Sequence, residues 1–488
     1  MNSWIRHISL EEMSQNDYDI LIVGTGAGGG TVLWRLCERL AKERIRIGIV
    51  EAGDLVVPTH TQNLPTVNVD DVVFMWRSPK YVKHYRTNYA SNDAAPIPID
   101  FHQPVIFGGG MVHWGHSCVR MDPVDLAEWP VPIGDMDFYY KTAERMMNVT
   151  RRVAAGSSIQ EVILQRLREN GFPEATDTPT AVDFTATQHG RINSSFFFSS
   201  ILLIARALNV KPFDLAVNAR TTRVLVENGH VSGIEAISRD KKPYMLRAKT
   251  VVLSAGTFGN PPILLQSGVG GRAVGHYLAN HSTVDSFLKI RRSEFAEVSG
   301  ILRVLIPRSA DRPFQFQLVT GDYYQPFKAK PLSEEWEIWL GAYGKVQSRY
   351  ENKVALDPVR RDEYGLPEVQ ISFSYSEEDL EIIRQMAALS RLAASAMSLP
   401  VPGEGEVCLR IPGREFHETG TCRMGENPET SVTGRYGQVH GVSGLFVADN
   451  SVLPTSGTAN PTLSTIALAI RTSDYISEQL KSSLKKQF

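Results

Sequence analysis

Three glycines and one acidic residue near the start of the chain have the spacing of a dinucleotide site. Gly24, Gly26 and Gly29 form a GxGxxG pattern, and Glu51 follows 22 residues after the last glycine. The first glycine permits a tight turn, the second lets backbone N–H groups approach a pyrophosphate, and the third lets a helix pack closely on a strand. A carboxylate at the position of Glu51 can accept hydrogen bonds from ribose hydroxyls. The pattern therefore predicts a dinucleotide with an unphosphorylated adenosine ribose, FAD or NAD.

The segments around these residues supply the elements that must position them. YDILIV (18–23) is a continuous apolar run, as a parallel strand buried on both faces requires, and IRIGIV (45–50) is a second one. The glycines lie between these runs, and a helix is expected over Thr31 to Leu40. Together the segments predict one βαβ unit, and this context makes a glycine pattern that is weak by itself specific.

Two later segments repeat the strand-to-helix arrangement. Val251 to Leu253 is a buried strand that runs into small residues and a helix begun by Pro261 and Pro262. Leu445 to Asp449 (LFVAD) is a further strand, and a helix is expected over Pro461 to Ile476. We therefore expect the dinucleotide domain to be assembled from segments that lie far apart in the chain.

The middle of the chain has a different pattern. Asn228-Gly229 lies between two strand-like runs and predicts a β-hairpin. Helices are expected over 161–170 and 196–208, and residues 286–411 alternate strand-like stretches with aromatic residues, which suits a second domain covering a pocket. These aromatic residues are Phe314, Phe316, Tyr323, Tyr324, Trp336, Trp339 and Tyr343.

Length, composition and charge are those of a soluble globular protein. The 488 residues suffice for about three domain-equivalents, or for one large enzyme body with a subsidiary domain. With 42% hydrophobic and 21% charged residues, the chain can bury most of its apolar surface. The 51 basic residues balance 53 acidic ones without a long basic run, which argues against nucleic acid and anionic membranes as partners.

The four cysteines, Cys37, Cys118, Cys408 and Cys422, are too few and too far apart for a disulfide framework or a zinc site. We interpret them as free thiols in a reducing compartment. The amino-terminal segment lacks the apolar region of a signal peptide, and no apolar run reaches the length of a membrane span. The expected location is therefore the cytoplasm.

The carboxy-terminal third contains HETGTCRMG (417–425), with VHGVSGLFVADN and TANPTLSTIALAI further along. These segments resemble the glucose-methanol-choline (GMC) family of FAD-dependent oxidoreductases. YDILIVGTGAGGG, VVLSAGTFGNPPILLQSG and GHYLANH (275–281) agree with the family in the same order. FGGGMVHWGHSC (107–118) is similar to the pyranose-oxidase branch of sugar oxidoreductases.

The resemblance implies an α/β fold with a discontinuous, Rossmann-like FAD-binding domain and an α+β substrate domain built on a mainly antiparallel sheet. We expect the FAD-binding domain to comprise residues 16–130, 191–285 and 412–488, and the substrate-binding domain 131–190 and 286–411. The isoalloxazine ring is expected between the two domains.

The resemblance also implies a catalytic pair, His417 and Asn460, beside the flavin. Oxidising an alcohol removes a hydride from carbon and a proton from oxygen, and a neutral imidazole is suited to take the proton. The Asn460 carboxamide can hydrogen-bond the same hydroxyl and orient the C–H bond. Asn460 is also expected to cap a helix with Pro461 at its first position, so that the helix N-terminus stabilises the anionic reduced flavin.

Further FAD contacts are implied at Gly109, Gly110, His113, Val224, Asp449, Pro461 and Thr462. His113 matches the histidine that can carry the flavin covalently in pyranose-oxidase-like enzymes, and the sequence leaves covalent and noncovalent FAD open. His113 and His116 lie in a glycine-rich loop without a third ligand, so no metal is expected. His281 is expected to be structural.

The leading hypothesis is FAD-dependent oxidation of a sugar or glycoside hydroxyl to a carbonyl, with aromatic residues stacking on a pyranose. The runner-up is an aminoglycoside or aminocyclitol intermediate, toward which Glu334, Glu335 and Glu337 are candidate ammonium contacts, although a solvated turn is expected. A non-redox FAD-containing lyase, an NAD-dependent dehydrogenase and a non-enzymatic role rank lower. No hydrolase or phosphoryl-transfer motif occurs. Oxygen or another small molecule is the expected electron acceptor, and the oligomeric state stays open.

Overall fold

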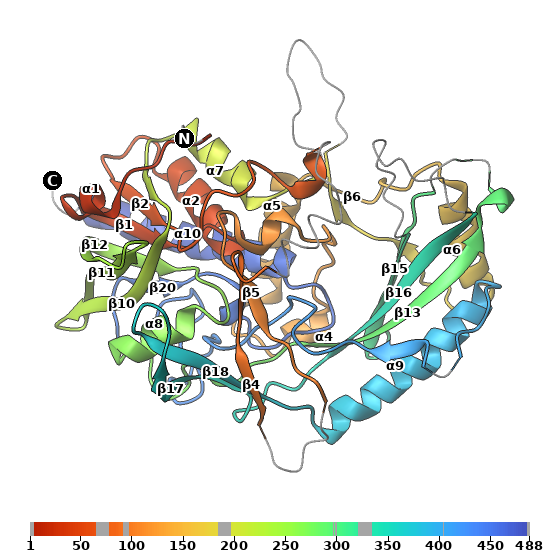
Figure 1. Cartoon of the computed structure of the whole chain (residues 1–488). Helices are drawn as coiled ribbons and strands as arrows, with labels where there is room; N and C mark the ends of the chain where they lie inside the picture. The colour runs from red at the N-terminus through yellow and green to blue at the C-terminus, as the bar shows by residue number, and fades with distance from the viewer. Residues whose placement is uncertain are drawn as a thin grey trace, which may run out of the picture.

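A computed structural model describes residues 4–64, 78–90, 97–183, 197–295, 297, 300–320, 334–403 and 405–485. Two large sheets dominate it, and Figure 1 shows them at opposite sides of the molecule, each with its own covering helices. The expected combination of a Rossmann-like α/β part and a part with an antiparallel sheet is confirmed. The residue boundaries of the two domains stay a prediction.

The first sheet is built around β1 (Asp17–Val23), which pairs in parallel with β2 (Ile47–Val50) on one side and β12 (Pro243–Leu253) on the other. Both faces of β2, of the second half of β1 and of the end of β12 are buried, as their continuous apolar sequence requires. β9 (Asp214–Ala216) extends the sheet beyond β2, and β20 (Leu445–Val447) pairs in parallel with β12. The prediction that distant segments assemble one sheet is therefore confirmed.

The expected hairpin closes one end of this sheet. β10 (Ala219–Glu227) and β11 (His230–Ser238) are antiparallel, and β11 pairs with β12. At the turn, Asn228 has φ 52° and Gly229 has φ 77°. Positive φ at both central residues is what a two-residue hairpin turn requires, and Asn-Gly supplies it at low cost.

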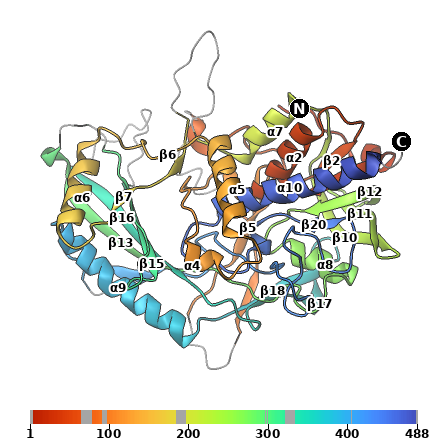
Figure 2. The same cartoon turned by 180° about the vertical axis from the view of Figure 1, so that it is seen from behind.

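Helix α2 (Ala27–Arg39) begins against the backbone of the sheet. A Cβ on Gly28 would lie 1.8 Å from the carbonyl oxygen of Ala448, and a Cβ on Gly29 would lie 1.8 Å from that of Gly24. Only glycine allows this approach. The helices α7 (Ser200–Leu208) and α10 (Thr462–Lys485) pack against α2, and Figure 2 shows α10 running along the sheet.

The second sheet is antiparallel throughout, in the order β19-β13-β16-β15-β14-β7. Side chains alternate between its faces. On β15 and β16, Phe314, Phe316 and Trp336 belong to a hydrophobic core shared with helices α6 and α9. Trp339 and Tyr343 lie on the opposite face, so only part of the expected aromatic set is available to a pocket; Tyr323 and Tyr324 lie outside the described residues. The bounds are β19 Val407–Leu409, β13 His281–Arg291, β16 Glu335–Lys345, β15 Phe314–Thr320, β14 Arg303–Ile306, β7 Thr176–Asp177, α6 Ser158–Glu169 and α9 Glu377–Ala396.

Smaller elements connect the two sheets. β17, β18 and β4 form a three-stranded sheet, β3 pairs with β5, and β6 pairs with β8. Their bounds are β17 Lys353–Arg361, β18 Pro367–Phe373, β4 Arg86–Tyr89, β3 Val82–His84, β5 His102–Pro104, β6 Val149–Thr150 and β8 Thr180–Ala181. The remaining helices are α1 Leu10–Ser14, α4 Pro123–Leu126, α5 Ile133–Met146 and α8 Asn260–Ser267, with short 3-10 turns η1 Thr61–Asn63, η2 Gly109–Val112, η3 Arg292–Glu294 and η4 Asn450–Val452. Across the described part of the chain, no helix has the length and apolarity needed to cross a bilayer.

Candidate active site

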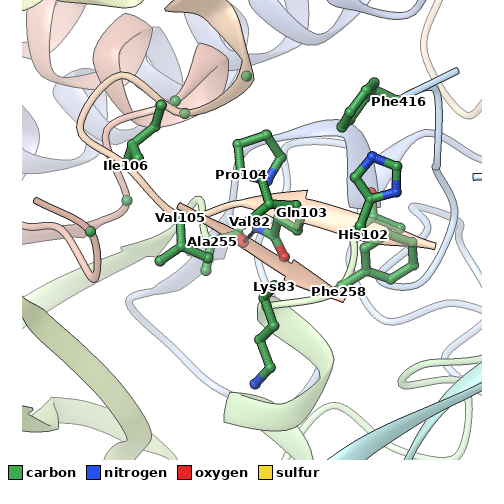
Figure 3. A pocket seen from close by; sticks show the side chains of 18 of the residues that line it. Val82, Lys83, His102, Gln103, Pro104, Val105, Ile106, Ala255, Phe258 and Phe416 are labelled. Carbon is green, nitrogen blue, oxygen red and sulfur yellow. Dashed lines mark hydrogen bonds between the residues drawn. The ribbon is translucent and has the colours of Figure 1, made fainter. Parts of the chain in front are cut away.

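A cavity of about 1330 Å³ lies between the two sheets. Its walls come from the ends of β1, β2 and β12, from η2, and from the cavity-facing side chains of β15 and β16. Figure 3 shows the β3–β5 pair along one wall, with Phe416 beside His102. The volume exceeds that of a typical small-molecule pocket, so the cavity has room for a dinucleotide together with a substrate.

One end of the cavity is lined by glycines. Gly24, Gly26 and Gly109 face it, and a Cβ on Gly109 would lie 3.0 Å from the Cα of Gly26. Gly26 precedes α2 without a side-chain cap, so the first N–H groups of that 13-residue helix are left for a ligand. A helix N-terminus of this kind, approached over bare backbone, fits a pyrophosphate.

Glu51 follows β2 directly, lies at the same wall and is buried. One carboxylate oxygen accepts hydrogen bonds from the N–H (2.9 Å) and hydroxyl (2.6 Å) of Thr25, and the other accepts from the N–H of Gly53 (2.8 Å). Burial raises the pKa of Glu51 above its usual 4.5. These bonds fix the carboxyl group at the cavity wall and leave lone pairs for ribose hydroxyls.

His417 and Asn460 come together at the other end of the cavity. The Nε2 atom of His417 is 3.4 Å from the Nδ2 atom of Asn460. The Oδ1 atom of Asn460 accepts a hydrogen bond from the Nε2 atom of Gln317, whose Oε1 accepts one from the hydroxyl of Ser117 at 3.0 Å. Burial, together with the charges of His281 and Arg410, lowers the pKa of His417 well below 6.5. The imidazole is therefore neutral over the ordinary pH range.

The backbone brings His281 behind His417. Ala279 and Thr419 exchange two backbone hydrogen bonds, of 3.0 and 2.9 Å, as in an antiparallel ladder. Two residues further along, His281 therefore faces His417, and their Nδ1 atoms are 2.8 Å apart. The side chain of His281, which was expected to be structural, therefore contacts the candidate catalytic residue directly.

The expected capping role of Asn460 is also wrong. The carbonyl of Pro461 accepts the first helical hydrogen bond, from the N–H of Thr465 at 2.9 Å, so α10 begins one residue later than predicted. Asn460 precedes the helix, and its carboxamide bonds Gln317 and His417 instead. Thr462, in the first turn of α10, lines the cavity.

An aromatic and charged wall continues from His417. The ring of Tyr343 lies 5.6 Å from that of His417, and Trp339 lies 6.1 Å beyond Tyr343. Trp339 donates a hydrogen bond to Asp285 (2.8 Å), and Arg410 binds both carboxylate oxygens of Asp285 at 2.7 Å while lying over the indole ring. The indole plane is therefore held from two sides while remaining partly exposed to the cavity.

The structure thus brings most of the predicted site residues to one cavity. Those that line it are Gly24, Gly26, Glu51, Gly109, Gly110, His113, His417, Asp449, Asn460 and Thr462. Gly29, Val224 and Pro461 do not line it. Gly29 packs on Gly24, as expected for the third glycine, whereas Val224 is buried in the core with its N–H donating to Ser267. Sequence reasoning missed Ser117, Gln317 and Arg410, because no motif distinguishes them.

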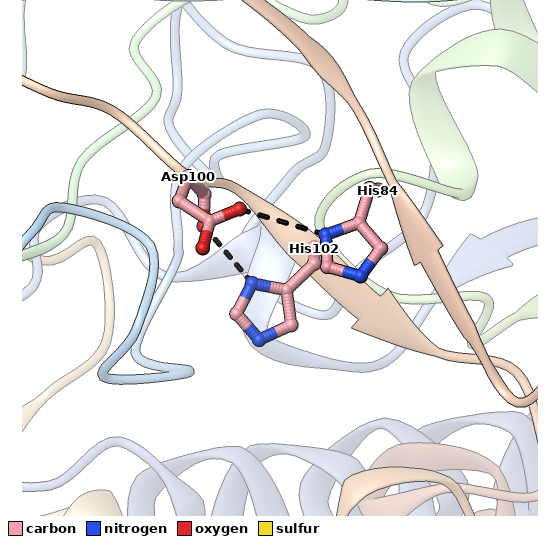
Figure 4. Close-up of side chains that lie close together, drawn as sticks. All are labelled: His84, Asp100 and His102. Atoms are coloured by element: carbon pink, nitrogen blue, oxygen red, sulfur yellow. Dashed lines mark hydrogen bonds and ion pairs between the residues drawn. The ribbon is translucent and has the colours of Figure 1, made fainter. Parts of the chain in front are cut away.

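Three potential metal ligands, His84, Asp100 and His102, lie within 4.8 Å of one another in the described part of the chain (Figure 4). The Asp100 carboxylate is 3.5 Å from the Nδ1 atom of His84 and 3.0 Å from the Nε atom of Arg414. The Nδ1 atom of His102 lies 2.9 Å from the backbone carbonyl of Asp100. Because Arg414 already pairs with the carboxylate, this group is an ion-pair cluster at the edge of the cavity.

Comparisons with known proteins agree with this geometry. Two family models, both described as GMC oxidoreductase, match residues 99–283 and 348–469. A C-glycoside 3-oxidase of Arthrobacter globiformis is 29% identical, covering 77% of this chain and 75% of the relative. A second C-glycoside 3-oxidase, of Microbacterium trichothecenolyticum, is 26% identical over 96% of this chain and 98% of its own length.

Proteins of lower sequence identity also match the chain over most of its length. The 6'''-hydroxyparomomycin C oxidase of Streptomyces lividus is 23% identical, covering 95% of this chain and 92% of the relative. The crystal structure of pyridoxine 4-oxidase from Mesorbium loti has a TM-score of 0.70 at 17% identity, covering 94% of this chain and 99% of that one. The fold of the chain is therefore shared over nearly its whole length.

Proposed function

The chain belongs to the GMC oxidoreductase family, and from this premise we propose that it oxidises a ring hydroxyl of a neutral sugar or glycoside to a carbonyl. The family implies FAD, which supplies the hydride acceptor when bound. The relatives named above are oxidases, and they argue against the lyase alternative. A cytoplasmic location and the electron acceptor stay predictions.

The chain offers residues suited to hold FAD. The uncapped N-terminus of α2 and the glycine pair Gly26 and Gly109 fit the pyrophosphate, and Glu51 fits the adenosine ribose. Asp449 and Thr462 line the same cavity. Asp449 accepts hydrogen bonds from the N–H of Gly256 and from the amide of Asn260, both at 2.7 Å, which joins the ends of two strand segments of the sheet.

His417 and Asn460 are proposed to bind the reacting hydroxyl between them. A hydroxyl oxygen can accept a hydrogen bond from the Nδ2–H of Asn460 while its proton faces the Nε2 atom of His417. Because desolvation lowers the pKa of His417 well below 6.5, the imidazole is present as the free base. Asn460 fixes the orientation of the C–H bond, and His417 takes the hydroxyl proton.

The observation that carries the sugar assignment is the Trp339–Tyr343 wall beside His417. A partly exposed indole held flat by Asp285 and Arg410 suits the apolar face of a pyranose. Arg303 and Arg410 line the same cavity together with carboxylates such as Glu415 and Glu418, so the charge of the lining does not choose between a neutral sugar and an aminoglycoside. Glu334, Glu335 and Glu337 do not line the cavity, and Glu335 lies 3.6 Å from Lys289.

A finer proposal concerns His113, which lines the cavity and is proposed to carry FAD covalently. Burial lowers the pKa of its ring to about 3, so the ring is neutral and nucleophilic. Attachment would join a ring nitrogen to a carbon of the flavin with loss of one proton from each partner, the two electrons passing to the oxygen or other small acceptor of the enzyme. Acid precipitation tests it: flavin in the pellet supports the link, and flavin released to the supernatant rejects it.

The substrate proposal is tested by mixing purified holoenzyme anaerobically with C-glycosides, O-glycosides, free sugars and aminoglycosides, and following flavin absorbance. We expect bleaching with a neutral sugar or glycoside, and a loss of at least about 100-fold in its rate in His417→Ala with FAD retained. A matched control is His276→Ala, since His276 lies outside the cavity lining. Bleaching only with aminoglycosides or with simple aliphatic alcohols would overturn the substrate class, and a normal rate in His417→Ala would overturn the base.

A further inference from the structure

A continuous series of hydrogen bonds runs through the candidate base. It connects Ser117, Gln317, Asn460, His417 and His281 in that order. At its far end, the Nε2 atom of His281 lies 3.1 Å from the carbonyl oxygen of Gly457 and 3.3 Å from that of Ser456. His417 is partly exposed, and the other four residues of the series are buried.

The end of this series fixes the direction of every bond in it. Carbonyl oxygens only accept, so the Nε2 atom of His281 must carry a proton. Burial lowers the pKa of His281 to about 4, so the ring is neutral and its Nδ1 atom holds a lone pair. At 2.8 Å, that lone pair needs a proton on the Nδ1 atom of His417. Neutral His417 then presents the lone pair of Nε2 to Asn460 and the cavity.

The amide end of the series agrees with this direction. The hydroxyl of Ser117 donates to the Oε1 atom of Gln317, and the Nε2–H of Gln317 donates to the Oδ1 atom of Asn460. The Nδ2 group of Asn460 is therefore the one that faces His417, and as a donor it requires a lone pair there. The amide end of the series is thus consistent with the tautomer of His417 that the carbonyl end assigns.

We propose that His281 is a positioning residue that holds neutral His417 with its proton on Nδ1, so that the basic Nε2 atom faces the substrate. The proposal rests on the role of His417 as base under the proposed function. When His417 takes the hydroxyl proton, its Nδ1–H remains bonded to His281, and the carbonyls of Ser456 and Gly457 stabilise the positive charge through that ring. Among the described residues, Tyr343 and Arg410 also face His417. Arg410 opposes the positive charge, so the contact with His281 compensates for it.

Two substitutions separate positioning from packing. His281→Leu removes the acceptor for the Nδ1–H of His417. His281→Gln restores an acceptor toward His417 and a donor toward the two carbonyls, but it cannot titrate. We expect the limiting rate of anaerobic flavin bleaching to fall at least about 100-fold in the Leu variant and to return to within about 10-fold of wild type in the Gln variant, with substrate Kd unchanged. The acid limb of the rate–pH profile should move in the Leu variant and stay in His276→Ala.

A direct measurement does not depend on the variants folding. Selective ¹⁵N-histidine labelling of the wild-type holoenzyme, with His417→Ala used to assign the signal, reports which ring nitrogen of His417 carries the proton. A protonated Nδ1 and a bare Nε2 are expected, and a protonated Nε2 in the neutral ring would overturn the proposal. Equal rate losses in the Leu and Gln variants, or a wild-type rate and pH profile in the Leu variant, would also overturn it. A wild-type rate in His417→Ala would instead reject the proposed base itself.

Discussion

Glu415 should make the stability of the protein fall as the pH rises. This residue is two positions before His417 and 6% exposed. One carboxylate oxygen accepts hydrogen bonds of 2.9 Å from Asn280 and from the N–H of Gly413, while the other has no hydrogen-bond partner among the described residues. Burial raises the pKa of Glu415 from 4.5 to about 7, against the opposing charge of Arg410.

The direction of the pH dependence follows from which state, native or unfolded, binds the proton of Glu415 more tightly. The native state holds the proton of Glu415 up to about pH 7, and the unfolded state only up to about pH 4.5. The stabilisation is therefore fully present below pH 4.5 and lost as the pH rises through 7. Over that interval, at 1.36 kcal/mol per pH unit, the loss is about 3 kcal/mol.

The substitution Glu415→Gln keeps the side chain neutral at every pH. We expect the variant to exceed wild type by about 3 kcal/mol at pH 8 and by less than about 1 kcal/mol at pH 5. For a chain of 488 residues, 3 kcal/mol corresponds to about 3 °C in Tm. Differential scanning calorimetry of the holoenzyme at both pH values measures it, with Glu351→Gln, at an exposed position, as the control. Parallel pH dependence of Tm in wild type and Glu415→Gln would refute the reasoning.

Three further substitutions test the cavity and the fold. Trp339→Ala should raise the Kd for the sugar at least about 10-fold while changing the limiting rate of flavin bleaching far less, because it removes the stacking surface and not the base; equal effects on both would contradict this. Gly109→Val should abolish FAD binding, because its Cβ would lie 3.0 Å from the Cα of Gly26 and its φ of 56° is strained for valine. The flavin-to-protein absorbance ratio measures this, and a normal flavin content would show that Gly26 and Gly109 do not form the pyrophosphate site. Ser376→Ala should cost about 1 kcal/mol by removing the capping box of α9, seen as a Tm decrease of about 1 °C without change in activity.

Local patterns predicted the elements that depend on local physics. Neighbouring residues alone were enough to predict three features: the apolar runs at β1 and β2, the glycines before α2, and the Asn228-Gly229 turn. The 20-residue helix α9 was not predicted, although Ser376 and Asp379 form a capping box that marks its start. Residues 286–411 as a whole were interpreted as strand-like stretches with aromatic residues, and this interpretation masked the helix signal.

The parts of the site that escaped prediction depend on contacts between distant segments. His281 faces His417 only because Ala279 and Thr419 pair, and the sequence does not encode that register locally. The residue type and position of Asn460 predicted a helix cap, but its carboxamide forms hydrogen bonds with Gln317 and His417 instead. Val224 shows the converse, since an apolar residue in a strand has no feature that separates core from cavity wall.

Because the first sheet is assembled from distant segments, it cannot be completed until late in the synthesis of the chain. About 420 residues separate the end of β1 from β20, which at 5–20 residues per second takes roughly 20–80 s to translate. Once β12 is complete, the edge that receives β20 stays unpaired while about 190 further residues are added, and the face of α2 that meets α10 is uncovered until α10 follows. Nascent chains therefore expose an aggregation-prone edge during the part of synthesis between β12 and β20. The yield of folded enzyme should depend on chaperone supply and on translation speed late in the message, more than on the stability of the finished molecule.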